Sequence, residues 1–230
     1  MKHQVLDSPD FGLLKTTFEA PGERLVSEAG AMVAMSSGLK MDTNMRGGLL
    51  AAAKRKLLGG ESMFQNTYVA TAAGQEVWLA PAPEGDIRHR RLGVGETLFL
   101  QSGAYVAHFG DKLQLDTKWG GVRSFFGGIG FFLLRVVGPG DLFFYSYGAI
   151  HEVDVGGGGY ACDTGHVVAF TDGLEYEIHK FGGFKGLFFS GEGLICRFRG
   201  EGKLFLQTRN APSLAAFLEP FRPVKTSSSD

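Results

Sequence analysis

The sequence has few of the features that mark secreted, membrane-spanning or nucleic-acid-binding proteins. It holds two cysteines in 230 residues, Cys162 and Cys196, without a C-x-x-C spacing, which favours a reducing compartment. The formal net charge is −1, so no global field attracts nucleic acid or anionic lipid. The most apolar stretch, residues 127–137, is too short to span a bilayer, and residues 1–10 lack the apolar run of a secretory signal. We therefore predict a soluble, cytoplasmic protein.

Motifs for catalysis and metal binding are also missing. Ser62 is not followed by the second glycine of a G-x-S-x-G elbow, and the histidines lack H-x-H or H-x₃-H spacing. The glycine run at residues 156–159 precedes neither a helix nor the lysine of a phosphate loop. His166 is expected to be a hydrogen-bonded strand residue, and both cysteines small core residues. We predict no catalytic residue, no metal and no cofactor.

Glycine and phenylalanine are abundant instead. The chain has 35 glycines and 20 phenylalanines, and the glycine count is well above average usage. Glycine at turns with aromatic residues on pleated faces is typical of many short strands. Hydrophobic residues make up 44% and charged residues 20%, which excludes disorder over most of the chain. The composition thus predicts a globular, all-β protein.

Four landmarks recur three times in the same order along the chain. The first is a pair of glycines eight residues apart, followed by an apolar strand, and its second members are Gly30, Gly103 and Gly165. An alternating strand follows, then a glycine-led strand, then a last strand after a turn glycine. Glutamates recur at the turn starts, where a carboxylate can accept turn N–H groups: Glu61, Glu96 and Glu192. One such unit cannot bury its apolar face alone, so we expect three units to share a core about a pseudo-threefold axis.

The predicted fold is therefore all-β, with threefold repeated strand units forming a β-sandwich or double-stranded β-helix-like single domain. Short helical corner connections join the strands. The single domain covers residues 1–210, and its repeats span about 20–85, 93–150 and 155–210. The alternative is a plain β-sandwich whose hairpins look alike through composition alone.

Little of the chain lies outside the repeats. Residues 13–18 are expected to supply an additional edge strand. Residues 211–224 form a proline-containing segment with a short helix at 213–218, and residues 225–230 a polar, disordered tail.

These landmarks, together with the motifs at residues 59–64, 163–170 and 191–194, resemble a family of mitochondrial-biogenesis proteins named after altered inheritance of mitochondria. The resemblance covers residues 18–210. Members of that family are similar in fold to the tryptophan RNA-binding attenuation protein, so the resemblance implies an all-β fold and an oligomer. It implies no activity, because the family has no established catalytic residues. No residue here matches the ligand or RNA contacts of the fold relative, so its function does not transfer.

The charge pattern of the three corner connections is the most informative local feature. Residues 46–60, 118–128 and 180–191 are apolar, flanked by glycine, and carry eight basic residues and no acidic one. Equivalent connections of a repeat lie at the same end of the molecule, so these charges should gather on one face. The residues expected to contact a partner or an anionic surface are Arg46, Lys54, Arg55, Lys56, Lys118, Arg123, Lys180, Lys185, Phe125 and Phe188. Alternatively, the phenylalanines pack under the corners and the basic groups are merely solvated.

Two functions remain open at this point. The first is a non-enzymatic, homo-oligomeric scaffold or interaction protein whose basic corner face meets an anionic membrane surface or an acidic protein partner. The second is a small-ligand-binding β-barrel protein, or an enzyme, with a site inside the sandwich that the sequence does not reveal. RNA binding draws only on the fold relative, and nucleic acid is not the expected partner.

Overall fold

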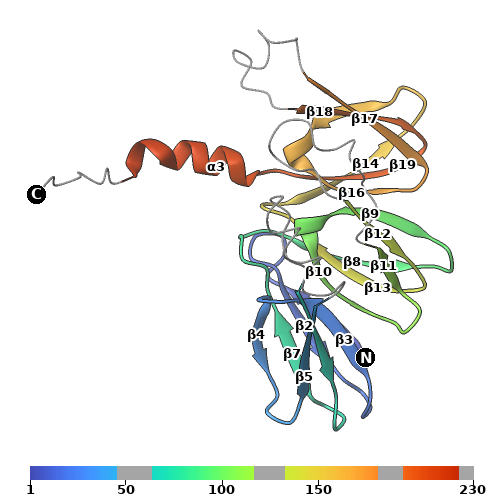
Figure 1. Cartoon of the computed structure of the whole chain (residues 1–230), viewed down its shortest axis with the longest axis vertical. Coiled ribbons are helices and arrows are strands. Elements are labelled where there is room, and N and C mark those ends of the chain that lie inside the picture. The colour runs from blue at the N-terminus through green and yellow to red at the C-terminus, as the bar shows by residue number, and fades with distance from the viewer. Residues whose placement is uncertain (46–63, 117–132, 181–193, 223–230) are drawn as a thin grey trace, which may run out of the picture.

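The computed structural model of the chain describes residues 1–45, 64–116, 133–180 and 194–222. Nearly all of its regular structure is β-strand, which confirms the predicted fold class. Figure 1 shows the strands grouped into three units along the long axis, with helix α3 (Ala211–Leu218) projecting to one side. The helical corner connections and the C-terminal tail predicted above lie outside the described residues.

Each unit consists of six strands within the described residues. Unit 1 contains β2 (Leu13–Thr17), β3 (Arg24–Glu28), β4 (Met32–Met35), β5 (Lys40–Met45), β6 (Phe64–Val69) and β7 (Glu76–Leu79). Unit 2 contains β8 (Ile87–Leu92), β9 (Thr97–Gln101), β10 (Tyr105–Phe109), β11 (Gln114–Asp116), β12 (Leu133–Val137) and β13 (Gly140–Tyr145). Unit 3 contains β14 (Ile150–Val155), β15 (Tyr160–Asp163), β16 (Val167–Thr171), β17 (Leu174–Lys180), β18 (Leu194–Gly200) and β19 (Gly202–Gln207). Short 3₁₀ turns, Ser102–Ala104 and Thr164–His166, precede β10 and β16.

The strands pair in the same antiparallel pattern in all three units. The first and third strands flank the sixth: β2 and β4 flank β7, β8 and β10 flank β13, and β14 and β16 flank β19. The second and fourth strands flank the fifth: β3 and β5 flank β6, β9 and β11 flank β12, and β15 and β17 flank β18. Even the irregularity repeats, because the third strand of each unit shifts register at one residue, namely Val33, Val106 and Val168. The repeat read from glycine spacing is thus confirmed.

Neighbouring units are joined by one further strand pairing. The third strand of a unit pairs with the second strand of the preceding unit, so β10 pairs with β3 and β16 with β9. Two six-stranded sheets result, β5-β6-β3-β10-β13-β8 and β11-β12-β9-β16-β19-β14. The outer sheets are β15-β18-β17, from unit 3, and β1-β2-β7-β4, in which β1 (Lys2–Leu6) is added to three strands of unit 1.

The buried residues form three clusters, whereas the sequence predicted one core about a pseudo-threefold axis. The cluster of unit 1 includes Val106 and Ala107 from unit 2, and the cluster of unit 2 includes Val168 and Ala169 from unit 3. The units lie in a row (Figure 1), and no described sheet contains strands of both unit 1 and unit 3. Units 1 and 2 each cover apolar residues with the next unit along the chain, so among the described residues the repeat propagates in one direction instead of closing on itself.

The segments outside the units follow the sequence prediction in part. The expected strand at residues 13–18 is β2, but it is the first strand of unit 1 and not an addition to the repeats. It lies between β7 and the additional strand β1, so β1 and not β2 forms the edge. The expected short helix is α3 (Ala211–Leu218), followed by the 3₁₀ turn Glu219–Phe221. The Asn210 side chain caps α3 by accepting a hydrogen bond from the Ser213 N–H at 2.8 Å. Neither α3 nor the described 3₁₀ turns are long and apolar enough to cross a membrane.

Candidate functional site

The basic corner face predicted from the sequence lies almost wholly outside the described residues. Lys180 is the last residue of β17. The other residues of this face fall in the segments 46–63, 117–132 and 181–193. The face therefore stays a prediction, and the candidate sites below are built from the described residues.

The two ends of the row carry strands whose counterparts elsewhere are paired on both sides. β10 and β16 each lie between two strands, whereas their counterpart β4 pairs only with β7 among the described residues. Likewise β3 and β9 lie between two strands, whereas β15 pairs only with β18 there. β4 and β15 are therefore open sheet edges, and we call them the two open edges.

Both open edges expose apolar side chains that are buried at the equivalent positions. Val33 on β4 is 57% exposed, while its counterparts Val106 and Val168 are 0% exposed. Tyr160 on β15 is 42% exposed, while Leu25 and Leu98 at the same position of β3 and β9 are 0% exposed. These side chains are exposed because no described strand covers them at the ends of the row, whereas a strand of the adjacent unit covers their counterparts.

The composition of β4 leaves this edge without the usual protection. Its residues Met32, Val33, Ala34 and Met35 are all exposed and include no charge and no proline. The other described strands at sheet ends contain charged residues: β1, β5, β8, β11, β14, β15 and β17. Charged residues and proline on an edge strand prevent it from pairing with another chain. β4 is thus the described edge most suited to accept a further strand.

The structure brings the two cysteines together, which their spacing in the sequence does not reveal. Cys162 on β15 lies opposite Cys196 on β18, and both thiols are free. Burial raises the pKa of the Cys162 thiol to about 12 and raises that of Cys196 as well. Both thiols are therefore protonated near neutral pH and are poor nucleophiles. Cys196 is a small core residue as predicted, while Cys162 is partly buried at the open edge.

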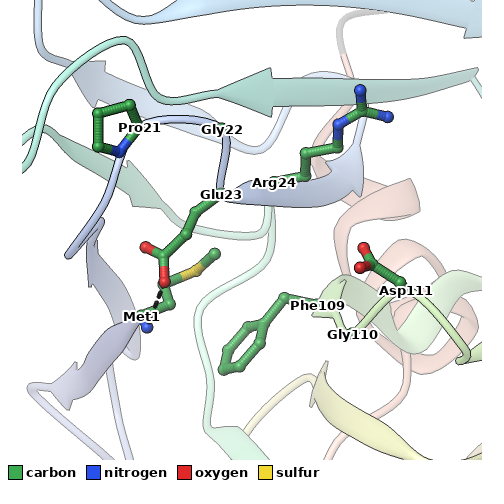
Figure 2. A pocket seen from close by; sticks show the side chains of 8 residues that line it. All are labelled: Met1, Pro21, Gly22, Glu23, Arg24, Phe109, Gly110 and Asp111. Carbon is green, nitrogen blue, oxygen red and sulfur yellow. Dashed lines mark hydrogen bonds and ion pairs between the residues drawn. The ribbon is translucent and has the colours of Figure 1, made fainter.

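A surface hollow of about 410 Å³ lies where the turn before β3 approaches unit 2 (Figure 2). Its lining is Met1, Pro21, Gly22, Glu23, Arg24, Phe109, Gly110 and Asp111. The Met1 amino group donates hydrogen bonds to Glu23 Oε1 at 2.9 Å and to Glu19 Oε2 at 2.8 Å. These contacts raise the pKa of the amino group and tie β1 to the turn. The Glu23 carboxylate of the hollow is thus already engaged within the chain.

A histidine pair lies close by, at the junction of units 1 and 2. The ring centroids of His3 and His89 are 4.2 Å apart, and each lies 5.0 Å from the ring centroid of Phe143. His89 Nε2 lies 2.7 Å from Asp141 Oδ1. Desolvation and the neighbouring His89 lower the pKa of His3, which keeps its ring neutral near pH 7. The pair therefore packs β1 against β8 and β13.

Other polar residues that the sequence analysis singled out have structural partners. His166 Nδ1 lies 2.7 Å from the Gln207 carbonyl oxygen and His166 Nε2 lies 2.9 Å from the Asn210 side-chain nitrogen. The expected hydrogen bonding is thus present, but His166 ends the 3₁₀ turn before β16 and does not lie on a strand. Glu96 Oε2 accepts the Gly93 N–H at 2.9 Å, which confirms the predicted role of this glutamate in its turn. Glu61 and Glu192 lie outside the described residues. Within those residues, no group of three or more His, Cys, Asp and Glu side chains could hold a metal ion.

This architecture defines a class of all-β protein in which three six-strand units follow one another and leave two open edges. The chain belongs to the mitochondrial biogenesis AIM24 family, whose model matches residues 3–209, and this confirms the resemblance seen in the sequence. It is 30% identical over 233 residues to a protein of Streptococcus pyogenes serotype M6 named Uncharacterized protein M6_Spy0233, covering 98% of this chain and 93% of that one. The crystal structure of protein SPYM3_0169 from Streptococcus pyogenes superimposes with a TM-score of 0.78 at 28% identity, covering 96% of this chain and 99% of that one. No biochemical function is established by this membership.

Proposed function

We propose that this chain is a non-enzymatic, homo-oligomeric scaffold or interaction protein. The observation that carries the proposal is the pair of open edges, β4 and β15, with the exposed apolar residues Val33 and Tyr160. Apolar groups on an unpaired strand edge favour the addition of a further strand, because this satisfies backbone hydrogen bonds and removes apolar surface from water. The burial of the equivalent residues inside the chain supports this directly.

The ligand-binding alternative has weaker support. A small-molecule site needs several polar groups that converge on one cavity. In the hollow of Figure 2 the Glu23 carboxylate is engaged by the Met1 amino group, and the thiols of Cys162 and Cys196 are protonated near neutral pH. Binding of an anionic surface by the corner face, a cytoplasmic location and a likeness to the tryptophan RNA-binding attenuation protein remain predictions from the sequence.

Native mass spectrometry of the purified chain over a range of concentrations tests the proposal. We expect masses at integer multiples of the chain mass, with dissociation on dilution. A protein that stays monomeric at every concentration would contradict self-assembly. A retained small molecule of constant mass would instead support the ligand-binding alternative.

A further inference from the structure

We propose that copies of this chain join head to tail, with β15 of one copy pairing antiparallel with β4 of the next. The inference rests on the homo-oligomeric function proposed above and specifies its interface. Within one chain, the second strand of a unit receives the third strand of the following unit twice, as β3·β10 and β9·β16. Among the described strands, the second strand β15 receives no third strand, and the third strand β4 meets no second strand. The next copy would thus stand where a fourth unit would stand.

The register of the new pairing follows from the two that exist. Ala107 lies opposite Ser27 in the first junction, and Ala169 lies opposite Leu100 in the second. Cys162 is the unit 3 counterpart of these two residues, since it faces Cys196 as Ser27 faces Asn66 and as Leu100 faces Leu134. Ala34 is the β4 counterpart of Ala107 and Ala169, because it follows the same register shift. Ala34 of one copy should therefore lie opposite Cys162 of its neighbour, and Met35 opposite Ala161.

The buried clusters indicate what this pairing would complete. The clusters of units 1 and 2 each contain a valine and an alanine from the third strand of the next unit: Val106 with Ala107, and Val168 with Ala169. The cluster of unit 3 contains no such pair from a following unit. Val33 and Ala34 of the next copy are the matching pair. The same pairing would cover Tyr160 and Cys162, whose counterparts in units 1 and 2 are fully buried.

A second copy fits these edges better than an unrelated strand would. β4 and β15 differ in sequence, yet each is half of an interface that the chain already forms twice. A symmetric pairing of two β4 strands would leave the cluster of unit 3 without a third-strand valine of the kind that Val106 and Val168 supply to units 1 and 2. The two edges also lie on units at opposite ends of the row in Figure 1, so the contact is heterologous. Heterologous contacts extend an assembly until it closes into a ring, or else without limit.

Two variants test the interface, each blocking one edge. Val33→Asp places a charge where the neighbour's cluster should bury it, and Tyr160→Asp does so at the other edge. Both residues are exposed in the single chain, so both variants should fold. Each variant alone is expected to be monomeric by native mass spectrometry, because one half of every contact is blocked. An equimolar mixture should form a heterodimer, because the intact β15 of Val33→Asp can receive the intact β4 of Tyr160→Asp. Aspartate at both positions ensures that the blocked edges also repel each other.

Met41→Asp is the matched control. Met41 is an exposed apolar residue, at 44%, on the edge strand β5, which the proposal does not use. This variant should keep the oligomeric state of the unchanged chain. If the unchanged chain and both edge variants are equally oligomeric, the head-to-tail interface is wrong while the oligomeric function stands. If Tyr160→Asp alone still forms dimers, pairing is symmetric through β4 and the inference is overturned. A monomeric unchanged chain overturns both proposals.

Cross-linking tests the register without depending on blocked edges. In a Cys196→Ala background, Ala34→Cys should form a disulfide with the native Cys162 of the next copy under air oxidation catalysed by copper phenanthroline. Directly opposed residues on antiparallel strands have Cα atoms about 4.5–5.5 Å apart, which a disulfide can bridge. We expect a ladder of linked chains on a non-reducing gel, and single chains for Met41→Cys in the same background. Absence of the ladder from an oligomeric sample would refute the register.

Discussion

Val33 and Val106 occupy the same place in two copies of one unit, yet one is 57% exposed and the other 0% exposed. Each stands at the register shift of a third strand, and each strand pairs with the sixth strand of its own unit. The difference is the neighbour: β10 also pairs with β3, while β4 meets no such strand among the described residues. Whether the valine of a third strand is buried therefore depends on the preceding unit as well as on its own unit. An interior unit and a terminal unit should respond differently to the same substitution.

Aspartate at the two valine positions should give the largest difference. Val106→Asp would bury an unpaired charge among apolar residues and should cost about 3–5 kcal/mol of unfolding free energy, enough to prevent folding. Val33→Asp in the monomer should change it by less than about 0.5 kcal/mol, because the side chain is in water. Urea unfolding followed by circular dichroism measures both. Equal losses would mean that Val33 is covered within the single chain.

The reactivities of Cys162, at an open edge, and Cys196, in the buried cluster of unit 3, should extend the comparison between exposed and covered positions. With its pKa near 12, Cys162 should react with iodoacetamide at pH 8 roughly a thousandfold more slowly than an unperturbed thiol, because so little thiolate is present. Cys196, whose pKa is also raised and which is fully buried, should react more slowly still. Mass spectrometry of labelled peptides follows each site, with urea-unfolded protein as the fast control. Rapid labelling of Cys162 in the native chain would show that its edge opens readily.

Alanine at equivalent second-strand positions should give a smaller contrast. Leu98 on β9 is fully buried, so Leu98→Ala should cost about 2–5 kcal/mol of unfolding free energy. Tyr160→Ala in the monomer should cost about 1 kcal/mol, because that side chain is partly in water already. Thermal unfolding at a concentration where the chain is monomeric compares them. The Tyr160 loss should rise at higher concentrations if assembly covers this residue, and an unchanged loss would argue against coverage.

The smallest effect concerns the turn before the second strand, where unit 2 has Glu96 and unit 3 has Gly158. The Gly93 N–H and the Arg90 guanidinium hold the pKa of Glu96 below its usual range. Its contribution to stability is therefore present above the unfolded pKa of 4.5 and lost as the pH falls through the lower folded pKa. Glu96→Gln should cost about 0.5–1 kcal/mol at pH 7 and nothing once the carboxyl is protonated in both states. A pH series of urea unfolding curves measures this, and a cost that persists in acid would exclude the ionised carboxylate as its source.

Much of the fold could be predicted because it depends on local chemistry. Glycine-bounded turns and alternating apolar residues indicated the third to sixth strands of all three units, and the equivalence of Gly30, Gly103 and Gly165 agrees with the repeated strand pairing. The capped helix after Asn210 and the turn role of Glu96 also follow from short-range hydrogen bonds. β1 was missed because His3 and Gln4 interrupt its apolar pattern and because its packing depends on the distant residues His89 and Phe143.

The sequence by itself determined the all-β class, the threefold repeat and the family, because each follows from short motifs whose residues are close to one another in the chain. Only the tertiary structure decided that the units follow one another in a row, that Cys162 faces Cys196, and that β4 and β15 are the open edges. Strand pairing joins residues that are far apart in the chain. The sequence pattern of a unit is therefore the same whether or not another unit pairs with its edge strands. The physical reason is that a unit of two small sheets buries apolar residues against its neighbours in the row, and among the described residues units 1 and 3 each have such a neighbour on one side only.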